Sequence, residues 1–249
     1  MIRQLRRRAF RALVRALAQN LHRAPRLVLR IADVMAPFVF RRVLDRTVVM
    51  RNLIVADHLR AFGYARLRRS IALPDARIAK LPHPLIIGTF HLGALAAVGS
   101  MFAELPSNVL VLRATPKFTK PLPHVTIETT RGDEQHRARV FHRAIQFLQD
   151  GHFVFVPLDP EESARLAAPF RGRTLQLARG PFALARITGA PILPMIARWN
   201  GWSVELVLGE IIPASSDEAQ LAAAAAKWLE DYLDRHPSEI SERVIALTS

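Results

Sequence analysis

His91 is the residue of this chain whose type and position most directly suggest chemistry. It follows the apolar run 85–90, whose isoleucine and phenylalanine residues are typical of a buried strand, and a segment of small residues comes after it. In a parallel α/β sheet, ligands bind at the carboxyl ends of the strands. An imidazole placed there can remove a proton near neutral pH and pass it on. We therefore predict that His91 is a general base.

The remaining sequence predicts a sheet that positions this histidine. Strand and helix patterns alternate after residue 80, and this alternation implies a single α/β domain with a mostly parallel central sheet covered by helices. The last two strands are close in sequence, which favours an antiparallel pair. The predicted strands are 85–90, 108–113, 124–129, 152–158, 191–199 and 203–212. The predicted helices are 91–105, 133–150, 175–188 and 216–236.

Basic residues are concentrated in the N-terminal third of the chain. Residues 1–80 contain 19 lysines and arginines against 4 aspartates, whereas residues 81–249 contain 16 basic and 17 acidic residues. We therefore expect a basic helical segment over residues 1–80, followed by the α/β domain over residues 81–249.

The first predicted helix, residues 2–21, is amphipathic and rich in arginine. Its apolar residues recur at helical spacing, and four of its arginines lie on the opposite face. Such a helix can lie in the headgroup layer of an anionic membrane, and this is the partner that we predict. The alternative is a helix that packs on the domain and turns its arginines to water.

Composition argues against several classes of protein. The chain has no cysteine, which excludes disulfides and thiolate metal sites. Its best apolar stretch, 27–40, is interrupted by charges and is too short to span a bilayer. Arginines recurring over residues 3–15 argue against a cleaved signal peptide, while a mitochondrial-type presequence stays open. Known nucleic-acid motifs, phosphate-cradling loops and dinucleotide fingerprints are missing from the sequence. We expect neither a metal nor a nucleotide cofactor, and no nucleic-acid partner.

Four blocks of the sequence occur in an order and spacing that a known family shares. They read HLGALA at 91–96, GHFVFVPLD at 151–159, APFRG at 168–172 and LARITGAPILP at 184–194. In this order the chain resembles the lipid A biosynthesis acyltransferases, the lauroyl and myristoyl branch of the lysophospholipid acyltransferase superfamily, from about residue 51 to about residue 237.

The resemblance implies a peripheral enzyme at the cytoplasmic face of the inner membrane. Such an enzyme moves a fatty acyl group from a thioester, on acyl carrier protein or coenzyme A, to a hydroxyl of a lipid or glycolipid acceptor. It uses no cofactor beyond this donor, and acyl carrier protein is a further expected partner. In this setting the resemblance implies that His91 deprotonates the acceptor hydroxyl.

One position departs from the family pattern. The family carries Glu or Asp after the histidine and four intervening residues, whereas this chain has Ala96 there. Loss of an orienting carboxylate from such a histidine costs about 10⁴-fold in rate. Either another carboxylate reaches His91, or the protein binds lipid or acyl chains without turnover. Asp159 is the carboxylate best placed to reach His91, because it also follows the end of a predicted strand. Glu104, Glu161 and Glu162 are weaker candidates.

The resemblance also implies residues that bind substrate. Gly93 matches the first block, and Glu161 follows the segment that lines the family's active-site mouth. Arg131, Arg171 and Arg198 are predicted to hold phosphate of the acceptor or carrier, because a guanidinium can contact phosphate through two hydrogen bonds. The alternatives are that these arginines are simply solvated and that Asp159 is a turn residue at the end of a strand.

Overall fold

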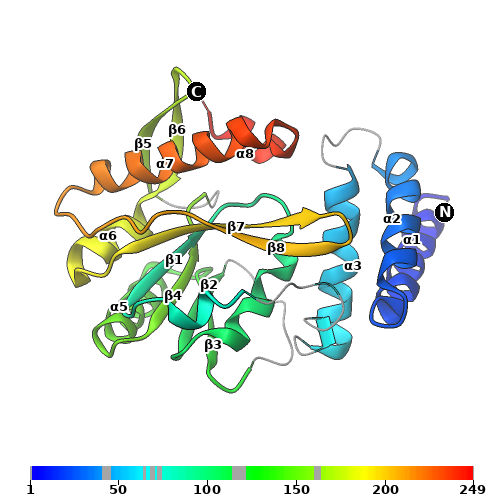
Figure 1. The fold of residues 1–249 in the computed structure, drawn as a ribbon, viewed down its shortest axis with the longest axis horizontal. Helices are drawn as coiled ribbons and strands as arrows, with labels where there is room; N and C mark the ends of the chain where they lie inside the picture. The colour runs from blue at the N-terminus through cyan, green and yellow to red at the C-terminus, as the bar shows by residue number, and fades with distance from the viewer. Residues whose placement is uncertain are drawn as a thin grey trace.

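A six-stranded sheet organises the structure, a computed structural model that describes residues 2–40, 46–63, 66–67, 71, 75–113, 122–159 and 164–248 (Figure 1). The strand order is β3-β2-β4-β1-β7-β8, and all neighbours are parallel except the final antiparallel pair. The strands are β1 (Leu85–Thr89), β2 (Val109–Arg113), β3 (Val125–Thr129), β4 (Phe153–Pro157), β7 (Ile192–Asn200) and β8 (Ser203–Leu208). The mostly parallel sheet predicted from the sequence is confirmed.

Helices cover both faces of this sheet, so its central strands are mostly buried. All five residues of β1 are buried, and they alternate between two cores: Leu85 and Ile87 face one, and Ile86 faces the other. One core also contains residues of α1, α2, α3 and η2, and the other contains residues of α5, α6 and α7. The bounds are α1 (Ile2–Asn20), α2 (Pro25–Val39), α3 (Arg46–Phe62), η2 (Leu95–Glu104), α5 (Glu134–Gln149), α6 (Arg179–Thr188) and α7 (Glu218–Arg235).

Two predicted helices differ from the structure. The segment after β1 is a loop followed by the 3-10 helix η2, because Gly93 adopts a positive φ of 55° and the Ala94 N–H bonds to the Ala197 carbonyl at 2.6 Å. The helix predicted over 175–188 begins only at Arg179, since the residues before it form a strand.

That strand belongs to a hairpin that the sequence analysis missed. Strands β5 (Arg165–Phe170) and β6 (Arg173–Ala178) pair antiparallel and pack against α7 (Figure 1). Their turn contains Arg171 and Gly172, both with positive φ. Partly buried and buried residues alternate over residues 174–177 of β6, which is the period-2 pattern of a strand. The remaining short elements are η1 (Ile78–Lys80), η3 (Pro237–Glu239) and α8 (Glu242–Ala246).

The three N-terminal helices form a layer at the edge of the molecule, with α3 between the α1–α2 pair and the sheet (Figure 1). In the described part of α1, Val14, Leu17 and Ala18 are buried in the core that also contains residues of α3, and the partly buried Phe10 and Leu13 pack against it. Nδ1 of His58 on α3 donates to the Ala18 carbonyl at 2.8 Å, and burial lowers the pKa of His58, which keeps the ring neutral. For α1, the structure therefore shows the alternative of a helix packed on the domain.

Arg51 joins the helical layer to the sheet. Its guanidinium bonds to both carboxylate oxygens of Asp33 on α2, at 2.8 and 2.6 Å, and to the Gly201 carbonyl at 2.8 Å. It also lies over the rings of Trp199 and Trp202, at 5.0 and 5.4 Å from their centroids. These contacts fix α2 and α3 against the β7–β8 hairpin. None of the helices among the described residues has the length and apolar character that crossing a bilayer requires.

Candidate active site

His91 and Asp159 meet at the carboxyl edge of the sheet. Strands β1 and β4 are parallel neighbours whose last residues, Thr89 and Pro157, are in register. Two residues beyond each strand end come His91 and Asp159, and the His91 Nδ1 lies 2.7 Å from Asp159 Oδ1. The other carboxylate oxygen accepts the backbone N–H of His91 at 3.0 Å. Asp159 thus fixes both the ring and the main chain of the histidine.

The two side chains differ in their access to solvent. The Asp159 side chain is 2% exposed, whereas that of His91 is 32% exposed. A buried carboxylate opposite Nδ1 makes this nitrogen the donor, so the lone pair of the neutral ring lies on Nε2. The same carboxylate stabilises the imidazolium that forms when Nε2 accepts a proton. The arrangement can therefore act as a general base with an orienting acid.

The loop that carries His91 is held at two further points. Asn52 on α3 donates from Nδ2 to the Gly93 carbonyl at 2.8 Å, and the Ala94 N–H bonds to Ala197 on β7. At Gly93, a Cβ atom would lie 2.3 Å from the Ala197 carbonyl oxygen. Gly93 therefore lets the loop approach β7 closely, which is a structural role for a residue predicted to bind substrate.

A largely apolar cleft of about 420 Å³ opens beside His91. Its floor is the face of the sheet that carries Val111, Ile127 and Phe155, and its other walls come from α3 and η2. The remaining lining residues are Val49, Asn52, Leu53, Ala56, Arg60, Thr89, Leu95, Ala96, Val98, Gly99, Phe102, Leu112, Arg113 and Pro157. Ala96, at the position where the family carries its acid, is thus part of the apolar wall. The cleft suits a hydrocarbon chain next to a base.

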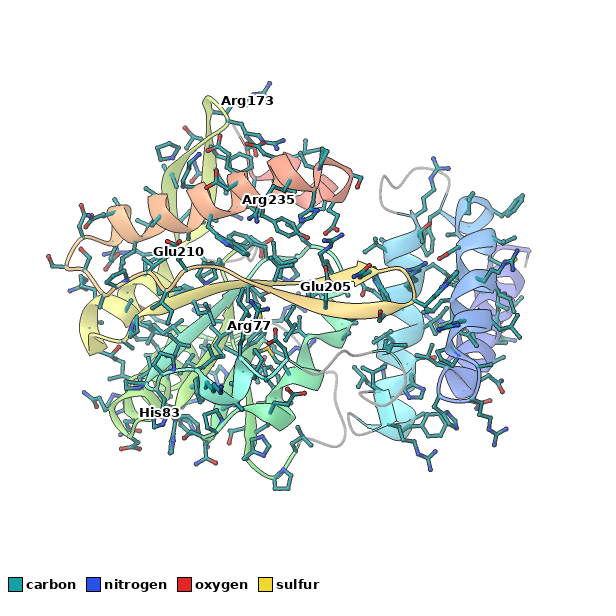
Figure 2. All side chains as sticks on the ribbon, in the orientation of Figure 1. Arg77, His83, Arg173, Glu205, Glu210 and Arg235 are labelled. Carbon is teal, nitrogen blue, oxygen red and sulfur yellow. The ribbon has the colours of Figure 1, made fainter. Side chains whose placement is uncertain are left out.

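The predicted arginines lie elsewhere. Arg131 follows β3 on an exposed loop, and Arg171 lies in the β5–β6 turn, where it pairs with Asp234 of α7 at 2.6 Å. Figure 2 shows the neighbouring Arg173 at the tip of this hairpin. Arg198 on β7 contacts Glu205 and Glu239, at 3.0 and 3.3 Å.

None of these three arginines lines the cleft, so their role in binding phosphate stays a prediction that this cleft does not support. Glu161 and Glu162 lie outside the described residues. The third alternative acid, Glu104, accepts the Asp75 N–H at 3.3 Å, and among the described residues it is Asp159 that binds His91.

Three polar residues of the cleft were not predicted from the sequence. Asn52 and Arg60 come from α3, and Arg113 comes from the end of β2. The strand-end position of Arg113, like that of His91, was a usable signal; nothing in the sequence pointed to the α3 residues. Within the described part of the chain, no group of three or more histidine, aspartate or glutamate side chains is arranged to hold a metal ion.

The comparisons with known proteins establish the fold. No protein-family model matches this chain, and no curated protein matches it significantly in sequence. A solved structure that is similar is the 1-acyl-sn-glycerophosphate (LPA) acyltransferase PlsC from Thermotoga maritima, with a TM-score of 0.50 and 14% identity. The match covers 95% of this chain and 100% of that one. The chain therefore shares with this PlsC structure its α/β fold, which in this chain is a mostly parallel sheet flanked and preceded by helices.

Proposed function

We propose that the protein is a peripheral membrane O-acyltransferase, which moves a fatty acyl group from a thioester donor to a hydroxyl of a lipid or glycolipid acceptor. The observation that carries this proposal is the His91–Asp159 pair, which opens on an apolar cleft. The fold shared with PlsC agrees with it. The donor in this proposal is acyl carrier protein or coenzyme A, and no further cofactor takes part.

The dyad supplies both proton transfers of such a reaction. Nε2 of His91 removes the proton of the acceptor hydroxyl as its oxygen attacks the thioester carbonyl. Asp159 stabilises the resulting imidazolium. When the tetrahedral intermediate collapses, the carbon–sulfur bond breaks and the imidazolium returns the proton to the leaving thiolate. The products are an ester and a free thiol.

The alternative is a relative that binds lipid or acyl chains without turnover. This alternative follows from Ala96, because the acyltransferases that the sequence resembles carry an acid at this position, near the histidine. Asp159 provides a carboxylate at hydrogen-bond distance from the same ring, so the alanine does not leave the histidine without an acid. We therefore favour the enzyme.

Thiol release from acyl-coenzyme A and from acyl-carrier protein, measured with mixed lysolipid acceptors, tests the proposal. We expect thiol release that depends on the acceptor, together with a matching amount of acylated lipid in mass spectra. Saturable binding of lysolipid without any thiol release from either donor would instead support the non-catalytic alternative.

Changing Ala96 to glutamate further distinguishes an active acyltransferase from a lipid-binding protein without turnover. In a site that Asp159 already serves, we expect Ala96→Glu to lower acyl transfer by about 10-fold or more, because a carboxylate in an apolar wall is costly to bury and repels the acyl chain. Turnover by both proteins is measured with the same donor and acceptor, and Ala96→Val serves as the control for size. Activity that appears only in Ala96→Glu would show that the natural site has decayed.

The membrane surface in this proposal is α2. The exposed fractions of Leu27, Ile31, Val34 and Phe38 are 60, 38, 62 and 72%, and their spacing puts them on one face of the helix. The opposite face, with Val28 and Ala32 among others, is buried in the core that α3 shares.

Cations flank this exposed stripe. Arg23, Arg26 and Arg30 are all exposed at the N-terminal end of α2. An apolar stripe beside arginines matches the interfacial region of a bilayer with anionic lipids. Because the thioester donors are intracellular molecules, we propose the cytoplasmic face of the inner membrane as the location.

Replacing Leu27, Val34 and Phe38 together by glutamine should release the protein from anionic vesicles. Partial burial of three large apolar side chains contributes about 3 kcal/mol, so we expect the vesicle partition coefficient to fall by about 100-fold. Sedimentation with phosphatidylglycerol-containing vesicles measures it. Ile187→Gln, which changes an apolar residue 46% exposed on α6, is the matched control and should bind as before. Equal loss in both variants would contradict α2 as the docking surface.

A further inference from the structure

Asn52 places an amide in the apolar part of the wall that α3 contributes to the cleft. Its neighbours Val49, Leu53 and Ala56 line the same cleft and are all apolar. The Oδ1 atom of Asn52 is buried, and it has no hydrogen-bond partner among the residues that the structure describes. A buried acceptor without a partner costs free energy, which a leucine of similar size would avoid. The contribution of this side chain is therefore expected to come from its other polar atom, Nδ2.

Nδ2 of Asn52 binds the loop that carries the base. It donates to the Gly93 carbonyl at 2.8 Å, and the N–H of the same peptide group, which belongs to Ala94, donates to the Ala197 carbonyl of β7 at 2.6 Å. One peptide group is thus held from both ends, by α3 and by β7. The peptide group that follows a glycine is otherwise free to rotate, because glycine tolerates many backbone conformations. Asn52 removes this freedom two residues after His91.

The part of α3 that carries Asn52 is itself fixed. The preceding residue, Arg51, bonds to both carboxylate oxygens of Asp33 on α2 and to the Gly201 carbonyl of the β7–β8 hairpin. Two helices and the sheet therefore meet at the residue next to Asn52. An amide held by such a frame sets the position of the loop, rather than following the movements of the loop.

We propose that Asn52 is a positioning residue for His91. By holding the Gly93–Ala94 peptide group against β7, it keeps the imidazole where Nε2 reaches the acceptor hydroxyl, while Asp159 fixes the ring itself. This inference rests on the proposed function and adds to its site a residue from the helical layer. A displacement of the base by about 1 Å is enough to lower the rate by about 10²-fold.

Kinetics and stability of Asn52→Leu test the proposal together. We expect kcat for acyl transfer to fall by about 10- to 100-fold and both KM values to stay within about 3-fold, because the base is displaced while the apolar wall is kept. Tm should stay within about 3 °C, since the lost bond to Gly93 is offset by removal of the unpaired oxygen. A lower Tm with an unchanged kcat would assign Asn52 a structural role and overturn the proposal.

Amide hydrogen exchange, measured by NMR without substrate, gives a readout that does not depend on turnover. In Asn52→Leu we expect the Ala94 amide to exchange about 10-fold faster or more, because its peptide group loses one of two restraints. The Ile86 amide of β1, which bonds to the Pro191 carbonyl, should exchange as before. Unchanged exchange at Ala94 would overturn the proposal. Faster exchange at Ala94 in a protein that transfers no acyl group would instead confirm the hold on the loop and refute the proposed function.

The matched control is Asn108→Leu, at the amino edge of the sheet. Asn108 directly precedes β2, and its Nδ2 lies 3.2 Å from Nε2 of His152. This variant also removes an asparagine that contacts one neighbour, but at the sheet edge opposite to His91. It should leave kcat and the exchange of the Ala94 amide unchanged. Equal effects in Asn52→Leu and Asn108→Leu would overturn the proposal.

Discussion

Replacing His91 by alanine is expected to lower kcat for acyl transfer by about 10⁴-fold or more. The imidazole lines the cleft with a base nitrogen next to an orienting carboxylate, and the other described lining residues include no histidine, carboxylate or lysine that could replace it as the base. Without it, the acceptor hydroxyl must be deprotonated by water. Turnover of donor and acceptor under saturating conditions measures the loss.

The fold should survive this change, because the ring is one-third exposed and contributes little to either core. Thermal unfolding of the variant tests this directly. His142→Ala, which removes an exposed histidine of α5, is the matched control and should retain full activity. Turnover within about 10-fold of the unmodified protein in His91→Ala would exclude this histidine as the base.

The sheet and the dyad could largely be predicted because they depend on local patterns. Short apolar runs without helical periodicity mark β1 and β4, and in a parallel sheet the residues that follow such runs come to one edge. Asp159 was the best-placed acid for this reason, although it is 68 residues from His91 in the chain. The register of β1 and β4, which decides whether the side chains touch, depends on core packing that the sequence does not display.

The helical layer shows why the exposed apolar face, which lies on α2, could not be predicted from the sequence. Both α1 and α2 are amphipathic, so periodicity alone cannot decide which apolar face another helix will cover. In the structure α3 covers the stripe of α1 and leaves Leu27, Val34 and Phe38 of α2 exposed. Likewise, Arg60 enters the cleft only because α3 packs over the sheet, whereas the sequence-predicted Arg171 is carried away by the unexpected β5–β6 hairpin.

Replacing Asp159 by asparagine should lower kcat by about 10⁴-fold while the two side chains keep nearly the same shape. The reason is that asparagine offers fewer hydrogen-bond acceptor atoms than aspartate does. Asp159 accepts two N–H groups of His91, one from the ring and one from the backbone, with two different oxygens. Asparagine has a single acceptor oxygen and one amide that donates.

If the asparagine oxygen keeps the backbone N–H, the amide faces Nδ1 and forces the ring proton onto Nε2, which removes the base from the cleft. If the oxygen turns to Nδ1 instead, the loop loses its bond to the His91 backbone and no charge stabilises the imidazolium. Either way catalysis suffers, and the residual rate should rise at higher pH as hydroxide replaces the base. Steady-state rates from pH 6 to 10 measure both effects.

The effects of replacing His91 and Asp159 should not multiply, because the two residues act as one unit. Since Asp159 acts through His91, the double variant His91→Ala, Asp159→Asn is expected to be no slower than His91→Ala alone, rather than slower by the product of the two losses. Asp234→Asn, which removes an exposed carboxylate of α7 that pairs with Arg171, is the control and should have full activity. Independent, multiplying losses in the double variant would mean that Asp159 contacts substrate itself, and a loss below about 10-fold in Asp159→Asn would leave the carboxylate with only a structural role.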